Sequence, residues 1–215
     1  MSRAAVVRAW WLCRHQVWPG SSALSADERA RADAMLRARD RAAYRRCRGA
    51  LRGILASWTG AEAAALRFDY TATGRPVLPA WPSLDFSVSH TADWAVIVVG
   101  TAGPLGVDVE QINQHGTDIG ALARRFLAPT GEPPPRSDAD FARAWTRYEA
   151  RVKAAGGSLG RPLPVEAATW PTIALDAPTG HAATLVCAGP ALPEVRVRLP
   201  WHTCRSPVRS AGDPR

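Results

Sequence analysis

Two acidic residues stand two positions apart in the segment Gly106-Val107-Asp108-Val109-Glu110. Residues two apart in a β-strand point to the same face, so Asp108 and Glu110 should project together while Val107 and Val109 enter the core. Neighbouring carboxylates repel each other, which raises a pKa or favours a cation between them. Their oxygen atoms suit a hard divalent ion such as Mg²⁺. The spacing alone equally allows two solvated acids on an exposed strand edge.

A second group follows a predicted helix, in which Phe141, Trp145, Glu149 and Lys153 stand at intervals of four. This spacing keeps consecutive members adjacent on one side of the helix. Lys153 is the only lysine in a chain whose other basic side chains are arginines. On spacing alone, the simpler interpretation is a core face of Phe141 and Trp145 followed by a surface ion pair worth under about 1 kcal/mol. If Glu149 joined the two strand carboxylates, it would become a third metal ligand instead.

Four arginines, Arg41, Arg45, Arg48 and Arg52, lie on one face of another predicted helix. Stacked cations repel each other unless an anion neutralises them, and guanidinium groups fit phosphate with two hydrogen bonds. A solvated basic face explains the same pattern equally well.

Polar residues also gather in Ser89-His90-Thr91, at the end of a predicted strand, and in the turn Gly74-Arg75-Pro76. A serine–histidine hydrolase pair is poorly supported, because adjacent residues on a strand face opposite ways. A single histidine in such a place is more often structural than catalytic.

The composition is that of a globular protein, with 47% hydrophobic and 21% charged residues among 215. The formal net charge of +8 indicates an anionic partner, such as a nucleic acid, an acidic protein or a phosphorylated small molecule. No segment approaches the roughly 20 apolar residues of a transmembrane helix. The N-terminal apolar run is interrupted by Arg8 and does not resemble a secretory signal. We therefore expect a cytoplasmic protein that is not embedded in a membrane.

The cysteines support the same interpretation. Cys13, Cys47, Cys187 and Cys204 are widely spaced and form no CxxC pair or zinc-type cluster. Free thiols in a reducing compartment are expected.

The elements expected to position these residues recur in the two halves of the chain, each of which supplies helices and strands. This order predicts an α+β fold built as one compact unit, with an N-terminal lobe over 1–104, a C-terminal lobe over 105–200 and a flexible tail over 201–215. Helices are expected at 25–39, 40–58, 119–127 and 138–155, and strands at 4–13, 66–70, 86–90, 94–99, 105–110, 167–175, 182–188 and 194–199.

The order of the motifs resembles that of the 4′-phosphopantetheinyl transferases, specifically the surfactin-synthetase-activating type. The family pattern has three blocks, approximately (F)NxSHS, GxDxE and WxxKExxxK, which correspond here to 86–91, 106–110 and 145–153. The resemblance covers roughly residues 20 to 190, and as an ordered set the blocks are specific. It implies a pseudo-dimer of two similar α+β lobes with coenzyme A bound between them.

The resemblance also implies roles for individual residues. Mg²⁺ (or Mn²⁺) would be held by Asp108, Glu110 and Glu149. The coenzyme A co-substrate would be held by Arg31, Arg48, Arg75, Ser89, His90 and Lys153.

The reaction implied is transfer of 4′-phosphopantetheine from coenzyme A to a serine of an acidic apo acyl or peptidyl carrier protein, with release of 3′,5′-ADP. Glu149 would act as the base and Lys153 would assist the leaving phosphate. The family's two-lobe members suggest a monomer. Fatty-acid, polyketide and nonribosomal-peptide carriers all stay open.

Three positions depart from the family pattern: Ser87 and Thr91 in the first block, and Tyr148 in place of the first lysine of the third. Tyr148 matters most, because a phenol cannot replace an ammonium group electrostatically. Arg147 or Arg151 could supply the missing charge.

Two alternatives therefore stay open: a catalytically impaired member that binds coenzyme A or a carrier protein, and a basic nucleic-acid-binding module. The second leaves the paired acids unexplained, since these repel phosphates without a metal.

Overall fold

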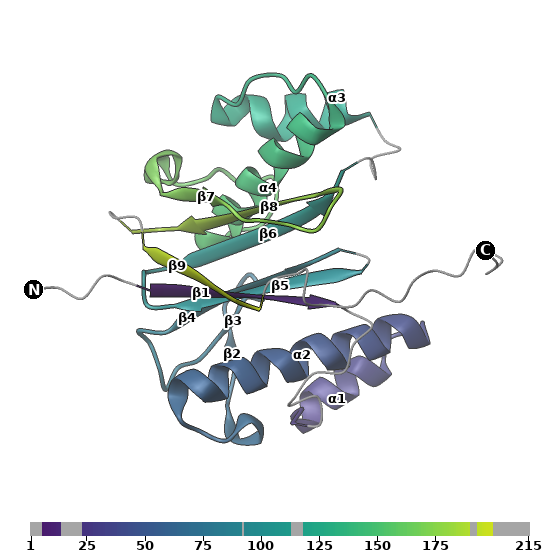
Figure 1. Cartoon of the computed structure of the whole chain (residues 1–215), viewed down its shortest axis with the longest axis vertical. Helices are drawn as coiled ribbons and strands as arrows, with labels where there is room; N and C mark the ends of the chain where they lie inside the picture. The colour runs from purple at the N-terminus through teal and green to yellow at the C-terminus, as the bar shows by residue number, and fades with distance from the viewer. Residues whose placement is uncertain (1–5, 14–22, 92, 113–117, 190–192, 200–215) are drawn as a thin grey trace, which may run out of the picture.

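Two β-sheets stacked between helices form the framework of the protein, as seen in the computed structural model (Figure 1). The structure describes residues 6–13, 23–91, 93–112, 118–189 and 193–199, so the expected tail at 201–215 and Cys204 lie outside the described residues. The first sheet has the strand order β4-β5-β1-β9, and the second has the order β6-β8-β7. The strands are β1 (Val6–Cys13), β4 (Asp85–His90), β5 (Trp94–Gly100), β6 (Leu105–Gln111), β7 (Thr172–Ala174), β8 (His181–Cys187) and β9 (Glu194–Leu199).

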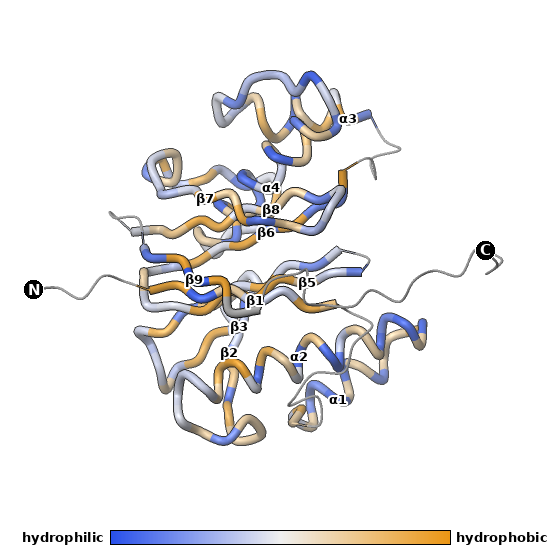
Figure 2. Tube along the Cα trace, in the orientation of Figure 1, coloured by the Kyte–Doolittle hydropathy of each residue, from blue (hydrophilic) through white to orange (hydrophobic). Residues whose placement is uncertain are grey.

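The two sheets bury their apolar faces against each other. Strand β1 places Val7, Ala9 and Trp11 into this inner core, and β6 places Val107 and Val109 into it from the other sheet. The alternation of side chains along each strand explains this arrangement, as predicted for β6. Figure 2 shows the hydrophobic residues concentrated along the strands, with hydrophilic stretches on the outer helices.

Helices cover the outer face of each sheet. Against the first sheet lies α2 (Ala38–Thr59), through a second core that includes Leu51, Leu55 and Ile97, and α1 (Ala26–Asp33) packs against α2. Against the second sheet lies α4 (Asp138–Ala154), which contacts both β6 and β8. The mixed α+β class is thus confirmed, and the similarity of the two lobes and their boundary at residue 104 stay predictions.

Most helix ends follow from local sequence. Ser25 caps α1 and forms a reciprocal capping box with Glu28, as expected from the sequence. Gly60 ends α2 in the left-handed conformation, with φ of 72°. The predicted helix over 25–39 is too long, because α1 ends at Asp33 and α2 begins separately at Ala38.

Two predicted strands are wrong in extent. Only Asp69–Tyr70 of the expected 66–70 is a strand (β2), paired with β3 (Pro76–Val77) in a short hairpin. The first part of 167–175 is a 3₁₀ helix over Val165–Thr169, and β7 begins only at Thr172. Proline explains this delay, since Pro171 has no N–H group to donate to a ladder.

The segment before α4 also coils tightly. There, α3 (Ile119–Leu122) continues into a π-helical turn, η2 (Ala123–Leu127), and a 3₁₀ turn, η3 (Ala128–Thr130). In the described part of the chain, no helix combines the length and apolar character required to cross a bilayer.

Candidate active site

Glycine 106 sets the distance between α4 and β6. A Cβ atom at this position would lie 1.8 Å from the carbonyl oxygen of Ala150 and 2.6 Å from the backbone nitrogen of Ala154. Only a residue without a side chain therefore lets the helix approach this strand so closely. This approach brings the side chains of Glu149 and Lys153 beside Asp108, which lies two residues further along the strand.

Asp108 is the centre of the resulting polar cluster. Its side chain is 2% exposed, and its Oδ1 atom lies 2.6 Å from Lys153 Nζ. The hydroxyl of Ser89 donates to the same oxygen at 2.7 Å and accepts from the Lys153 ammonium at 3.0 Å. Lys153 also lies 3.7 Å from Glu149 Oε2. Phe141 and Trp145 are core residues and the Glu149–Lys153 pair is present, as the simpler interpretation expects, but the pair is partly buried and Lys153 contacts Asp108 more closely than Glu149.

Strand β4 joins the first sheet to this cluster through its serines. Ser87 Oγ accepts from the backbone N–H of Val107 at 3.0 Å, and Ser89 Oγ accepts from that of Val109 at 3.4 Å. Alternation places both serines on the face that meets β6, which the sequence could have indicated. Ser89 thus holds Asp108 in place as well as lying in the predicted nucleotide-binding block.

Burial and nearby charge change the pKa of two of these carboxylates. Burial, followed by the nearby charges of Asp108 and Glu149, raises the pKa of Glu110 to about 7. Burial, followed by the charge of Asp108, also raises the pKa of Glu149. Asp108 and Glu149 therefore share one ammonium group, and Glu110 lies near enough to respond to the charges of all three.

Asp108 carries the feature of this cluster that bears most on cation binding. Asp108 Oδ2 is buried and has no hydrogen-bond partner among the described residues. Three carboxylates share a single lysine, so their negative charge is incompletely balanced. In the part of the chain that the structure describes, no three acidic, histidine or cysteine side chains form a ready-made metal site. The Lys153 ammonium instead bridges Asp108 and Glu149.

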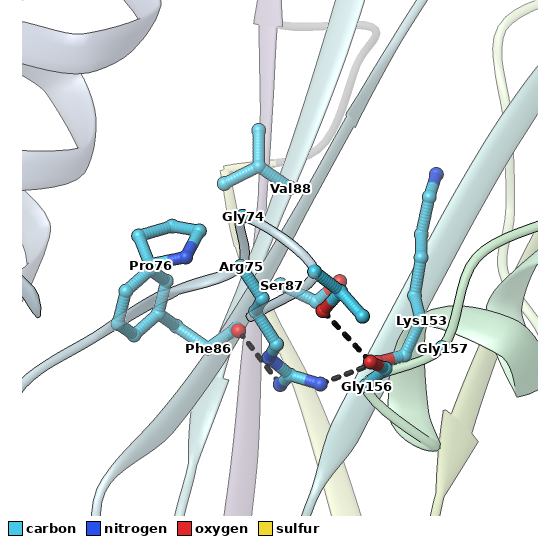
Figure 3. A pocket seen from close by; sticks show the side chains of 10 residues that line it. Gly74, Arg75, Pro76, Phe86, Ser87, Val88, Lys153, Gly156 and Gly157 are labelled. Carbon is cyan, nitrogen blue, oxygen red and sulfur yellow. Dashed lines mark hydrogen bonds between the residues drawn. The ribbon is translucent and has the colours of Figure 1, made fainter. Parts of the chain in front are cut away.

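Two adjoining cavities are lined in part by β4, and the smaller one reaches Lys153 of the cluster. The larger, about 690 Å³, is lined by Arg31, Arg48 and His90, together with side chains of α2. The smaller, about 250 Å³, is lined by Lys153, Arg75 and the turn around Gly74 (Figure 3). Pro76 and Val88 line both cavities, so an elongated ligand could extend from the arginines to Lys153.

The predicted arginine face is largely neutralised by the protein itself. Arg48 and Arg52 both bind Glu28, with Nε–carboxylate distances of 2.5 and 2.6 Å. Arg48 also stacks on Phe68, 4.1 Å from the ring centre. Arg52 is fully buried and so is structural. The sequence predicted only a capping role for Glu28, because local patterns do not indicate that Arg48, 20 residues away, is its partner.

Tyr148 does not face the acidic cluster. It is buried with Phe126 and Trp145, and its hydroxyl accepts from the backbone N–H of Gly160 at 3.4 Å. The neighbouring Arg147 donates two hydrogen bonds to Glu132, at 2.9 and 2.6 Å, and Arg151 lies 3.7 Å from the same carboxylate. The expectation that either arginine replaces the missing lysine charge is unsupported, since both pair with Glu132 and neither is paired with the acidic cluster in the structure.

Comparison with known proteins agrees with this geometry. The family model described as the 4′-phosphopantetheinyl transferase superfamily matches residues 104–195. The 4′-phosphopantetheinyl transferase HetI of a Nostoc species is 34% identical over 161 residues, which are 71% of this chain and 68% of that protein. The chain belongs to the 4′-phosphopantetheinyl transferase superfamily.

Two Bacillus subtilis relatives extend the comparison. One 4′-phosphopantetheinyl transferase is 31% identical over 119 residues, covering 53% of this chain and 51% of that protein. The transferase Sfp is 28% identical over 104 residues, covering 46% of this chain and 45% of that protein. The chain thus spans about half the length of these two relatives. The prediction of a 4′-phosphopantetheinyl transferase superfamily enzyme is confirmed.

Proposed function

We propose that this protein transfers the 4′-phosphopantetheine group of coenzyme A to a serine of an acyl or peptidyl carrier protein, as an enzyme of the surfactin-synthetase-activating type. Family membership supports the reaction. The observation that carries the assignment of the site is the contact of Lys153 with Asp108 and Glu149, with Glu110 nearby, in a cavity that adjoins the one lined by arginines.

Asp108, Glu110 and Glu149 would hold Mg²⁺ (or Mn²⁺). When bound, such an ion would neutralise charge on the coenzyme A diphosphate. The buried, unpartnered Asp108 Oδ2 supports this role, since a cation would satisfy an atom that the protein leaves unpaired.

The remaining residues would bind coenzyme A. Arg31, Arg48 and His90 line the larger cavity, so they would contact the nucleotide end and its phosphate groups. Ser89 would orient both Asp108 and Lys153. The prediction that Arg75 binds a phosphate competes with its protein contacts, because its guanidinium already donates to Asp85 and to the carbonyl oxygen of Leu105.

In the transfer step, the carrier serine oxygen attacks the phosphorus next to the pantetheine arm. The new serine O–P bond forms as the bond from phosphorus to the 3′,5′-ADP oxygen breaks. Glu149 accepts the serine proton, and its raised pKa makes it a stronger base than an ordinary glutamate. Lys153 donates a hydrogen bond or proton to the departing phosphate. Catalysis consists mainly of positioning and charge neutralisation.

The experiment is to incubate the purified protein with coenzyme A, Mg²⁺ and a panel of acidic apo carrier proteins, followed by intact mass measurement. A mass increase of one phosphopantetheine group on a carrier is expected. The Asp108→Ala variant should lose transfer while staying folded, and Asp140→Ala, which removes an exposed acid of α4, should retain it. Full activity of Asp108→Ala would overturn the metal assignment.

The two alternatives give different results. A catalytically impaired member would bind coenzyme A without modifying any carrier. A nucleic-acid-binding module would bind random DNA tightly, with strong salt dependence and no effect of coenzyme A.

A further inference from the structure

Arg75 joins four segments of the chain at the junction of the two sheets. Its side chain extends from the β2–β3 hairpin, and Nη2 lies 2.5 Å from Asp85 Oδ2 at the start of β4. The same nitrogen donates to the carbonyl oxygens of Phe86 at 3.2 Å and Leu105 at 2.9 Å. Nη1 donates to the carbonyl oxygen of Lys153, in the last turn of α4. Figure 3 shows the guanidinium group turned toward the carbonyl oxygens of Phe86 and Lys153.

The end of α4 is where a guanidinium group has most effect on a helix. The last carbonyls of a helix lack partners within it and carry partial negative charge, so a cation there stabilises them. A second contact comes from the same hairpin, where the Thr73 hydroxyl donates to the carbonyl oxygen of Gly156 at 2.8 Å. The hairpin therefore holds α4 at Lys153, in its last turn, and the chain just beyond the helix at Gly156.

Asp85 orients the arginine. Its Oδ2 atom accepts from Arg75 and from the backbone N–H of Leu105 at 2.6 Å. Both partners are largely shielded, with the Arg75 side chain 17% exposed and that of Asp85 24% exposed. Because Leu105 begins β6, this carboxylate fixes the arginine relative to the strand that carries Asp108.

Lys153 is consequently held at both of its ends. Its carbonyl oxygen is bound by Arg75, and its ammonium group contacts Asp108 and Ser89. The side chain has several rotatable bonds, so its ammonium position depends on where the backbone of the last turn is held.

We propose that Arg75, oriented by Asp85, is a positioning residue that fixes the last turn of α4 and thereby places the Lys153 ammonium. As far as it concerns catalysis, this inference rests on the proposed function. It differs from direct binding of a coenzyme A phosphate by Arg75, because the guanidinium hydrogen bonds already serve the protein.

The single lysine makes a direct test possible. Protein labelled with ¹³C-lysine and carrying no tag gives one lysine Cε signal, which reports on Lys153 alone. We expect this signal to move toward the position of free lysine in Arg75→Ala and in Asp85→Asn, and by less in Thr73→Val. Arg143→Ala is the matched control, because it removes an exposed arginine of the same helix that pairs with Asp140. Its signal should not move.

Kinetics then separate positioning from phosphate binding. A misplaced catalytic group can cost about 100-fold, so Arg75→Ala and Asp85→Asn should each lower kcat by about that factor with little change in KM for coenzyme A. Direct phosphate binding predicts the opposite split: a higher KM in Arg75→Ala, with Asp85→Asn unchanged or tighter because the arginine is released. In a Lys153→Met background, Arg75→Ala should add almost no further loss of kcat.

The outcomes are distinguishable. An unmoved lysine signal in folded Asp85→Asn or Arg75→Ala, or the KM pattern of direct binding, overturns the positioning role. If Arg75→Ala does not fold, Asp85→Asn and Thr73→Val decide the question, since Asn keeps an acceptor and Val keeps the shape. If the unmodified protein transfers nothing, the proposed function fails, and the lysine signal still tests the placement.

Discussion

At the scale of single residues, Asp108 differs from an ordinary buried acid because its two oxygens have unlike surroundings. Oδ1 binds both Ser89 and Lys153, whereas Oδ2 has no partner among the described residues. A buried carboxylate that is half satisfied costs stability, and such a cost is typical of a site built for a ligand. Asp108 is therefore better explained by binding than by folding.

Glu110 should make the metal-free protein less stable as the pH rises. Its pKa is raised to about 7 by burial and then by Asp108 and Glu149, so the folded protein holds a proton that the unfolded chain has already released. Stability should therefore fall between about pH 5 and pH 7. Thermal unfolding in EDTA should show this slope in the wild type and a weaker one in Glu110→Gln. Equal slopes would contradict the assignment.

Tyr148→Phe should leave transfer almost unchanged. The hydroxyl makes one long hydrogen bond to Gly160 N–H, so its loss should cost no more than about 1 kcal/mol of stability. Chemical unfolding and carrier modification measure the two effects. A large fall in kcat with stability intact would show that the phenol takes part in the reaction, despite its place in the aromatic cluster.

At the scale of elements, the contact of α4 with β6 decides whether the site exists. Gly106→Ala forces a methyl group against the backbone of Ala150 and Ala154. Overpacking of this kind costs about 1–3 kcal/mol and sometimes more, and backbone atoms yield less readily than side chains. We expect a loss of about 3 kcal/mol in chemical unfolding and a loss of transfer. Val109→Ala is the control, because it leaves a cavity beside the same strand without pushing α4 away. This variant should lose stability but keep more transfer activity than Gly106→Ala.

The pairing of α1 with α2 through Glu28 should make the stability of the fold depend on pH. Burial alone would raise the pKa of Glu28, but hydrogen bonds from Arg52, the Ser25 backbone and Arg48 outweigh it and lower the pKa. The carboxylate therefore stabilises the fold above its unfolded pKa, and this contribution is lost as the pH falls through the folded value.

Glu28→Gln should cost about 3–5 kcal/mol at pH 7, because Arg52 would be left buried beside a neutral partner. Its deficit relative to the wild type should shrink in acid. Denaturant unfolding at pH 7 and pH 4 measures this, and a deficit independent of pH would argue against a charged Glu28.

Elements and site were predictable from sequence to different extents. The alternation in 105–110 and the spacing of four from Phe141 to Lys153 predict the strand, the helix and their acids, because these patterns depend on local geometry. The bonds of Ser89 to Asp108 and of Arg75 to Asp85 depend on how distant segments meet. The pairing of Glu28 with two arginines was missed for the same reason, whereas the effect of Pro171 on β7 is local and the sequence could have indicated it.

At the scale of the whole molecule, helix, sheet, sheet and helix layers place the candidate site where the two sheets adjoin (Figure 1). The chain carries a formal net charge of +8. A basic enzyme and an acidic carrier protein attract each other through a long-range electrostatic force that dissolved salt screens. The two proteins should therefore associate faster than two neutral proteins would.

Transfer at low carrier concentration should therefore slow steeply as NaCl rises from about 20 to about 500 mM. Over this range the Debye length shortens toward its value of roughly 3 Å at 1 M, so long-range attraction is lost. The rate at saturating carrier should change much less, because positioning within the complex does not depend on long-range attraction. Initial rates at both carrier concentrations test this. Equal salt dependence of the two rates would locate the effect in the chemistry instead.

The parallel pairing of β1 with β9 has a consequence for biosynthesis. Val6 of β1 pairs with Glu194 of β9. During synthesis, β1 can therefore meet β9 only after the long intervening chain has left the ribosome. Until then one side of β1 is an open edge able to recruit strands from other nascent chains. Such long-range closure slows folding, and holding chaperones during translation would be expected to raise the yield of native protein.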